Sequence, residues 1–282
     1  MSAPAAIIFT DLDGTLLDHD TYGYGAAVPA LEAIRARGLP LVFATSKTLA
    51  EAAALAARLR IHAPLIVENG CAICYPPGGP GPRDAQVAAP VDGYAVVHLC
   101  PGYGRIVDFV ERQRSRHGWR LRGFNDMSAR EVARVTGLDA RTAAMAKQRL
   151  CDEPFEWLDT DINLGAFCVA AKAEGIQVTH GGRFGHLIGS SDKGKAAASV
   201  LEAYRDPDGK APLVIAAGDS ANDIPMLQLA DIAVVVRRHD GTWLEVNGRS
   251  RTLRTPSPGP AGWNEALLQV LDTLQEHDDE EV

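Results

Sequence analysis

The sequence predicts an α/β fold: a Rossmann-like, doubly wound parallel sheet with an inserted α+β cap domain. Short apolar runs alternate with helical stretches rich in Ala and Leu near both ends of the chain. This alternation is typical of parallel strands that are joined by helices and buried on both faces. The middle of the chain lacks the alternation, and a Pro/Gly cluster at residues 76–82 separates it from the first part.

Each expected element of the alternating parts is short and bounded by turn residues. We expect strands at residues 6–10, 39–44, 64–67, 213–217 and 232–236. We expect helices at residues 28–37, 48–60, 193–204, 224–230 and 263–274. Because ligands of such a sheet bind beyond the carboxyl ends of its strands, the residues that follow each strand are the first candidates for a functional site.

The middle part of the chain is expected to form the inserted cap. Residues 94–99 predict a strand, residues 106–116 and a series of short helices up to residue 175 follow, and the strand-like residues 184–188 lead back to the core. We therefore expect a core made of residues 1–84 and 190–282. The cap is expected at residues 85–189.

The bulk composition excludes several classes of protein. The 282 residues are 46% hydrophobic and 23% charged, which is typical of a globular protein with a buried core. The formal net charge of -8 argues against nucleic acid as a partner, since binding its phosphate backbone needs a basic surface. We see neither a signal peptide nor an apolar run that could span a membrane, so we expect a cytoplasmic protein without a membrane partner. The oligomeric state stays open.

The five cysteines argue against a full disulfide framework, because their number is odd. Cys71 and Cys74 have the C-x-x-C spacing of some zinc and redox sites. A zinc site needs a second pair or suitably spaced histidines nearby, and none is obvious. We therefore expect two buried, reduced thiols.

The strongest chemical signal directly follows the first expected strand, in Asp11-Leu12-Asp13-Gly14-Thr15. Two carboxylates two residues apart at the end of a strand can both face one site. Taken alone, the motif could also be a surface turn, since Asp and Gly are common turn residues.

A second signal, Thr45-Ser46-Lys47-Thr48, follows the second expected strand and begins a helix. Hydroxyl and backbone N–H groups at such a position bind anions. Alternatively, Ser46 or Thr48 is the N-cap of that helix. Lys193 begins another expected helix, where the helix dipole disfavours a cation. It therefore indicates a phosphate partner, unless it is an ordinary surface lysine.

The fourth signal, Gly218-Asp219-Ser220-Ala221-Asn222-Asp223, follows the strand expected at residues 213–217. It adds two carboxylates and an amide, and oxygen-rich clusters of this kind suit a hard cation, Mg²⁺ above all. Alone, it could be a loop. All four signals stand at strand ends or helix starts of the predicted sheet, which indicates a single site.

In order, spacing and structural context, these four stretches resemble the four motifs of the haloacid dehalogenase superfamily of phosphohydrolases. The resemblance implies that Asp11 is the nucleophile and forms an aspartyl-phosphate. It implies that Asp13 is the general acid for the leaving alcohol and then the general base for water. Thr45 and Lys193 would hold the transferred phosphoryl oxygens.

The same resemblance implies Mg²⁺ as the cofactor. The ion would be held by Asp11, by the backbone carbonyl of Asp13 and by Asp219, with Asp223 nearby. It would offset the repulsion between a carboxylate nucleophile and a phosphate dianion.

The insertion between the second and third motifs resembles the type-II cap of sugar and other small-metabolite phosphatases. Further stretches resemble the family of mannosyl-3-phosphoglycerate phosphatases over nearly the whole chain: residues 45–48, 123–128, 152–155, 181–189 and 259–265. Two positions depart from that family's pattern. Gly185 stands where an aromatic residue is expected, and Cys151-Asp152 stands where Tyr-Ser is common. The resemblance implies hydrolysis of mannosyl-3-phosphoglycerate to phosphate and mannosylglycerate, a compatible solute.

The implied substrate, a phosphorylated sugar-glycerate, carries a carboxylate beside its phosphate and so needs a further cation. Lys47, Arg183 and His186 are the candidates, with Arg183 first because a guanidinium can grip a carboxylate with two hydrogen bonds. Arg183 could equally pair with a cap carboxylate, and His186 could be packed in an apolar strand. The expected substrate-binding residues are Ser46, Lys47, Arg183, His186 and Asn222.

Several alternatives stay open. The substrate could be another sugar phosphate, such as glucosyl-3-phosphoglycerate or sucrose 6-phosphate, and a phosphosugar mutase would return the phosphoryl group to the sugar. A non-catalytic phosphosugar-binding relative would usually lack an aspartate of the first or fourth motif, whereas all are present here. Phe155 and Trp157 either line the sugar pocket or form the cap core, and Trp263 is expected in the core.

Overall fold

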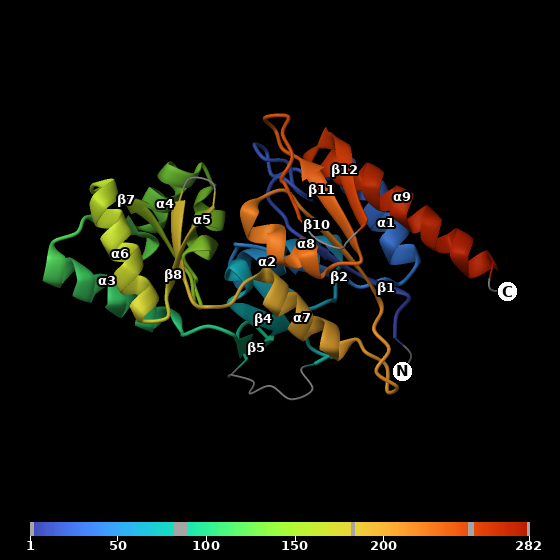
Figure 1. Ribbon diagram of the computed structural model, residues 1–282, viewed down its shortest axis with the longest axis horizontal. Coiled ribbons are helices and arrows are strands. Elements are labelled where there is room, and N and C mark those ends of the chain that lie inside the picture. The colour runs from blue at the N-terminus through green and yellow to red at the C-terminus, as the bar shows by residue number, and fades with distance from the viewer. Residues whose placement is uncertain (1–2, 82–89, 182–183, 248–250, 281–282) are drawn as a thin grey trace. The chain divides into compact units, whose positions relative to one another are not determined.

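The computed structural model describes residues 3–81, 90–181, 184–247 and 251–280 (Figure 1). The chain forms two compact units. The first consists of Met1–Thr45 and Lys193–Val282, and the second is Ser46–Asp192. The chain therefore leaves the first unit directly after Thr45 and returns to it at Lys193. The cap predicted at residues 85–189 lies within the second unit, and its limits stay a prediction.

The strands of the first unit lie parallel to one another in the order β12-β11-β10-β1-β2. Their bounds are β1 Ala6–Thr10, β2 Leu41–Ala44, β10 Leu213–Gly218, β11 Ile232–Arg237 and β12 Arg251–Pro258. Thr10, at the end of β1, lies opposite Ala217 in β10 and Phe43 in β2. The carboxyl ends of these three strands are therefore neighbours at one edge of the sheet.

Helices cover both faces of this parallel sheet. Their bounds are α1 Val28–Ala36, α7 Lys193–Ala203, α8 Ile224–Leu229 and α9 Gly259–Glu280. α9 packs against α1, β11 and β12, whereas α8 packs against α7, β10 and β11. Figure 1 shows the two pairs of helices on opposite sides of the strands. Because both faces are covered, every residue of β1 is buried.

The second unit contains antiparallel strands. β3 Leu65–Val67, β4 Ala72–Tyr75 and β5 Ala95–His98 pair in succession, and a four-stranded group has the order β6-β7-β9-β8. The members of that group are β6 Leu121–Gly123, β7 Glu153–Trp157, β8 Gln177–Gly181 and β9 Phe184–Ile188. The helices are α2 Leu49–Leu59, α3 Tyr103–His117, α4 Ala129–Thr136, α5 Ala140–Ala146 and α6 Asp161–Ala173.

The main apolar core of the second unit is aromatic. Phe109, Trp119, Phe155 and Phe167 are buried together, and Trp157 packs against them. Neighbouring rings in this core lie 5.3–6.5 Å apart between centroids, for example Trp157 and Phe167 at 5.3 Å and Phe155 and Trp157 at 6.5 Å. Phe155 and Trp157 are therefore core residues, the second of the two roles expected for them.

The predicted α/β class is confirmed, and the expected strands and helices of both chain ends are present. Most boundaries differ by one or two residues, whereas α9 begins at Gly259 rather than at residue 263. β4, β8 and β12 are not among the predicted strands, and neither are β6 and β7, which lie where only helices were expected. In the part of the chain that the structure describes, no helix is both long and apolar enough to cross a membrane.

Candidate active site

Asp11 is held rigidly at the carboxyl end of β1. Its backbone N–H donates to the carbonyl of Ala217 in β10 at 2.9 Å. Its own carbonyl accepts a hydrogen bond from the Thr10 hydroxyl at 2.8 Å, and that hydroxyl accepts one from the Trp263 indole N–H at 3.0 Å. Trp263 is fully buried, as expected, and it also supports the backbone that carries Asp11.

Lys193 reaches Asp11 from the first residue of α7. Its Nζ donates to Oδ1 of Asp11 and to Oδ1 of Asp223, both at 2.6 Å, and its side chain is 1% exposed. The surface-lysine alternative is therefore wrong. The close approach depends on Gly194, because a Cβ there would lie 2.5 Å from the carbonyl oxygen of Pro225.

Burial and like charge oppose ionisation of the carboxylates in this cluster. The pKa of Asp11 is raised well above its usual value, first by burial and then by the neighbouring Asp223. Burial and Asp223 also raise the pKa of Asp219 to about 6. Burial acts to lower the pKa of Lys193, but Asp11 and Asp223 outweigh it and raise that pKa, so the ammonium stays charged.

The loop after β10 presents Asp219 and anchors Asp223. Oδ2 of Asp223 accepts hydrogen bonds from the backbone N–H groups of Asp219 and Ser220, at 3.1 and 3.0 Å. Asp219 itself accepts from the Thr15 hydroxyl at 3.2 Å. A Cβ at Gly218 would lie 2.6 Å from Cβ of Asp223, so only glycine leaves room for this turn.

The three carboxylates fit a divalent metal ion. One oxygen from each of Asp11, Asp219 and Asp223 lies within 4.8 Å of the others. Carboxylate oxygens are the ligands that hard cations prefer. Burial, followed by the charge of Asp223, raises the pKa values of Asp11 and Asp219. Lys193 supplies one positive charge to three carboxylates, so a further cation would be favourable here.

Asp13 and Thr45 occupy the same edge of the sheet. Asp13 follows Asp11 in a tight loop, in which Gly14 adopts a positive φ of 80° and its N–H donates to the carbonyl of Leu17 at 2.9 Å. Asp13 is partly exposed, as its predicted exchange of protons with ligand and water requires. Thr45 directly follows β2 and is 1% exposed.

The sequence around these residues matches a known protein family. The family model described as haloacid dehalogenase-like hydrolase matches residues 8–79 and 172–243, which include every motif above. The chain belongs to the haloacid dehalogenase-like hydrolases.

Two curated relatives share one name, glucosyl-3-phosphoglycerate/mannosyl-3-phosphoglycerate phosphatase. The protein from Methanococcoides burtonii is 40% identical over 266 residues, which cover 94% of this chain and 97% of the relative. The protein from Persephonella marina is 37% identical over 271 residues, which cover 95% of this chain and 98% of the relative.

Solved structures of phosphatases share the fold at low sequence identity. A phosphatase from Bacteroides thetaiotaomicron has a TM-score of 0.62 at 15% identity, and the match covers 96% of this chain and 95% of that one. The sucrose-phosphatase of Synechocystis has a TM-score of 0.55 at 18% identity, over 96% of this chain and 99% of the other.

The predicted substrate-binding residues of this hydrolase are spread over both units. Asn222 lies in the turn after β10, where its side-chain oxygen accepts from the Ser220 hydroxyl at 2.7 Å. Ser46 and Lys47 begin the second unit and are partly exposed. The N-cap of α2 is Thr48, whose hydroxyl accepts from the N–H of Glu51, so Ser46 is not that cap. Arg183 lies outside the described residues.

His186 is buried in β9 and bound to a carboxylate. Its Nδ1 lies 2.9 Å from Oδ2 of Asp152, and its side chain is 9% exposed. Asp152 belongs to one of the two positions that depart from the family pattern, and it is fully buried. Gly185, the other departure, faces the ring of Phe155, and a Cβ there would lie 2.5 Å from that ring. Phe155 thus fills the space that an aromatic residue at 185 would need.

Two groups near the carboxylates of Asp219 and Asp223 are absent from the predicted site. Thr15 binds Asp219, and its place in the first motif is a signal that could have identified it. Arg238 donates from Nε to the carbonyl of Asp219 at 2.9 Å. No motif includes Arg238. The sole feature of the sequence that could have identified it is its position directly after β11.

The cysteines are free and mostly buried, as expected. Cys71 and Cys74 are both fully buried, and burial raises the pKa of Cys74 to about 12. Such a thiol is unreactive at neutral pH.

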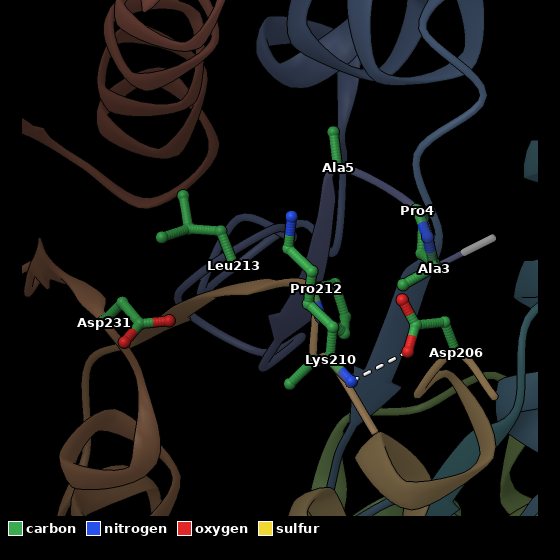
Figure 2. Close-up of a pocket in the computed structure, with 9 residues that line it drawn as sticks. Ala3, Pro4, Ala5, Asp206, Lys210, Pro212, Leu213 and Asp231 are labelled. Carbon is green, nitrogen blue, oxygen red and sulfur yellow. Dashed lines mark hydrogen bonds between the residues drawn. The ribbon is translucent and has the colours of Figure 1, made fainter. Parts of the chain in front are cut away.

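A pocket of about 610 Å³ lies at the amino ends of β1 and β10, away from the carboxylates (Figure 2). Its acidic groups are engaged in the fold: Asp206 accepts from the backbone N–H of Lys210, and Asp231 from that of Val214, both at 2.8 Å. Because the strands are parallel, this pocket and the candidate active site are at opposite edges of the sheet.

Proposed function

We propose that this hydrolase is a Mg²⁺-dependent phosphatase that converts mannosyl-3-phosphoglycerate to mannosylglycerate and phosphate. The observation that carries the proposal is the buried contact of Lys193 with Asp11, beside Asp219, at the carboxyl edge of the sheet. The names of the two curated relatives support the substrate. Those names include glucosyl-3-phosphoglycerate, which we propose as a second substrate.

Asp11 is the proposed nucleophile. Lys193 binds its Oδ1, which leaves Oδ2 to attack phosphorus. The new bond joins Oδ2 to phosphorus, and the bond from phosphorus to the glycerate oxygen breaks. Asp13 gives its proton to that oxygen. Asp13 then takes a proton from water, whose oxygen forms a bond to phosphorus while the bond from phosphorus to Oδ2 breaks. Phosphate leaves and the Asp11 carboxylate is restored.

A bound Mg²⁺ would offset the repulsion between the Asp11 carboxylate and the phosphate dianion. Asp11, the Asp13 carbonyl and Asp219 would hold it, with Asp223 nearby. Asp223 has a second role in this proposal, since it binds Lys193 and the turn that carries Asp219. Thr45 and Lys193 would hold the oxygens of the transferred group.

The rest of the substrate needs its own binding groups. We assign Lys47 and Arg183 to the glycerate carboxylate, because each can supply the cation that it needs. Ser46 and Asn222 remain proposed contacts, and His186 is a weaker candidate because Asp152 already binds it. The cap at residues 85–189 would set specificity, and a cytoplasmic location remains a prediction.

The test is phosphate release from a panel of esters, with and without Mg²⁺. The panel contains mannosyl-3-phosphoglycerate, glucosyl-3-phosphoglycerate, mannose 6-phosphate, sucrose 6-phosphate and 3-phosphoglycerate. We expect release to depend on Mg²⁺. We expect kcat/KM for the glycosyl phosphoglycerates to exceed that for the other esters by about a hundredfold or more, which corresponds to about 2.7 kcal/mol. Asp11→Asn is the inactive control.

Three other outcomes would contradict parts of the proposal. Mg²⁺-dependent release without preference would leave the chemistry and reject the substrate. Isomerised sugar phosphate without net release of phosphate would indicate a mutase. Binding of the ester by the parent without any turnover would indicate a non-catalytic relative.

A further inference from the structure

Two hydrogen bonds to its own backbone carbonyls hold the segment Ser46–Lys47 in place within the second unit. The carbonyl of Ser46 accepts a hydrogen bond from Nη1 of Arg149 at 3.0 Å. The carbonyl of Lys47 accepts one from the backbone N–H of Glu68, also at 3.0 Å. The backbone of this proposed substrate-binding segment is therefore set by two residues that are distant in the sequence.

Arg149 is itself fixed on several sides. Its Nε donates to the carbonyl of Ala146 at 2.8 Å, and its guanidinium lies over the ring of Phe124 at 5.7 Å from the centroid. Its Nη1 lies 3.5 Å from Oδ2 of Asp152, and its side chain is 5% exposed. A guanidinium held in this way has little freedom to follow Ser46 if that residue moves.

Asp152 is the centre of a buried polar network. Besides its contact with Arg149, it lies within hydrogen-bond distance of two side chains. Nδ2 of Asn69 donates to its Oδ2 at 3.3 Å, and Nδ1 of His186 lies 2.9 Å from the same oxygen. Asp152 is fully buried. Its departure from the family pattern therefore supplies the carboxylate that orients Arg149.

Glu68 closes the network on the other side. Its two carboxylate oxygens accept the backbone N–H groups of Leu150 and Cys151, at 2.7 and 2.8 Å. Glu68 and Asn69 both have positive φ values, of 50° and 60°, which cost energy for residues other than glycine. Glu68 thus binds Lys47 through its backbone N–H, and its side chain binds the two residues that follow Arg149.

Burying such a network costs free energy, so it is not an efficient way to stabilise a fold. Buried charges lose their hydration, and replacing a buried ion pair by apolar residues is often neutral or stabilising. A polar network that binds both carbonyls of a ligand-binding segment has a functional use instead, because it fixes that segment before substrate arrives.

We propose that Arg149, oriented by Asp152, and Glu68 are positioning residues that set the Ser46–Lys47 segment for the glycerate part of the substrate. The proposal rests on the proposed function, in which Lys47 meets the glycerate carboxylate. Arg149 and Glu68 touch no reacting atom in this scheme. Their effect is on binding of an ester that carries a carboxylate, and far less on phosphoryl transfer from a simple ester.

The test compares two substrates in Arg149→Met and Arg149→Lys. The substrates are mannosyl-3-phosphoglycerate and p-nitrophenyl phosphate, which has no carboxylate. In Arg149→Met we expect KM for the glycerate ester to rise by about tenfold or more, and the fall in kcat/KM to exceed that for p-nitrophenyl phosphate by a similar factor. Arg149→Lys keeps the charge and is expected to recover part of this loss. Arg130→Met, at an exposed residue of α4, is the matched control and should change neither substrate.

An equal fall in kcat/KM for both substrates, or no change for either, would overturn the proposal, because a merely structural role does not distinguish them. If Arg149→Met does not fold, Asp152→Asn keeps the shape of the network and should raise KM for the glycerate ester in the same direction. Failure of the proposed function would appear differently: the parent itself would prefer another ester of the panel. If that ester carries a carboxylate, the same comparison is made with it, and a retained preference in Arg149→Met would reject the positioning role. If that ester carries no carboxylate, the positioning role toward the glycerate part is rejected directly.

Discussion

The ammonium of Lys193 lies 2.6 Å from Oδ1 of Asp11, and both side chains are buried. The same ammonium binds Asp223 at 2.6 Å. This contact joins the first residue of α7 to the residue that follows β1, so one ion pair connects two residues that are distant in the sequence. It gives Asp11 a fixed orientation and a positive neighbour, which a carboxylate needs if it is to attack a phosphate.

Replacing Lys193 by Met is expected to affect both activity and stability. Methionine has a similar length but leaves Asp11 and Asp223 buried without their cation. Removing one partner of a buried pair destabilises a protein by about 3–5 kcal/mol. Urea unfolding without metal should show a loss of this size, and phosphatase activity should be lost. Lys195→Met, at an exposed residue of the same helix, is the control. A variant with parental stability and activity would contradict the role of Lys193.

The sequence predicted the four motifs well because each is local. A strand of consecutive apolar residues, followed at once by acidic or hydroxyl residues, indicates both the buried sheet and the edge where its ligands bind. Asp11, Asp219 and Asp223 were named on that ground, and Lys193 was named because it begins a helix. The structure brings all four together.

Other elements and contacts could not be predicted from the sequence, because they depend on partners that are distant along the chain. β12 has no apolar run and most of its residues are exposed, so its pairing with β11 supplies the order that its composition does not. β4 directly follows the turn at Glu68–Gly70 and pairs back on β3. The contact of Arg149 with Ser46 joins residues that no motif relates.

The effect of Mg²⁺ on stability is expected to depend on pH. The pKa of Asp219 is about 6 in the metal-free fold and its usual value is 3.8, and the pKa of Asp11 is also raised. Between these values the folded state holds protons that the unfolded chain has released. These groups therefore add stability as pH falls from 6 toward 3.8, and that stability is lost as pH rises.

A metal ion reverses this dependence because it binds the deprotonated carboxylates. The rise in Tm that Mg²⁺ gives over chelator should be small at about pH 5 and larger at about pH 8. Thermal unfolding in both conditions measures it, and the difference between them cancels the other titrating groups. The Asp219→Asn variant should lose most of the rise. An equal rise at both pH values would count against metal binding at these carboxylates.

Gly218→Ala tests the tight turn after β10. The new Cβ would lie 2.6 Å from Cβ of Asp223 and 2.7 Å from its Oδ2, so Asp223 must move. That movement breaks its contacts with Lys193 and with the N–H groups of the turn. We expect a stability loss of about 1–3 kcal/mol, together with a large loss of phosphatase activity. Gly25→Ala, where a Cβ meets nothing within 4 Å, is the control. Full activity in Gly218→Ala would show that the position of Asp223 is not critical.

Asp13→Asn separates the two proposed roles of the first motif. Asn cannot give a proton to the leaving oxygen, but it leaves Asp11, Lys193 and the metal-binding carboxylates unchanged. The loss in kcat/KM for a glycosyl phosphoglycerate is expected to be about 10²–10⁴-fold, the usual contribution of a general acid or base. For p-nitrophenyl phosphate the loss should be much smaller in the first step, because p-nitrophenolate leaves without a proton. Burst kinetics with this ester would then show rapid release of p-nitrophenolate followed by slow turnover, since water attack still lacks its base. Equal losses for both esters, with no burst, would assign proton transfer to another residue and leave Asp13 only its backbone carbonyl as a metal ligand.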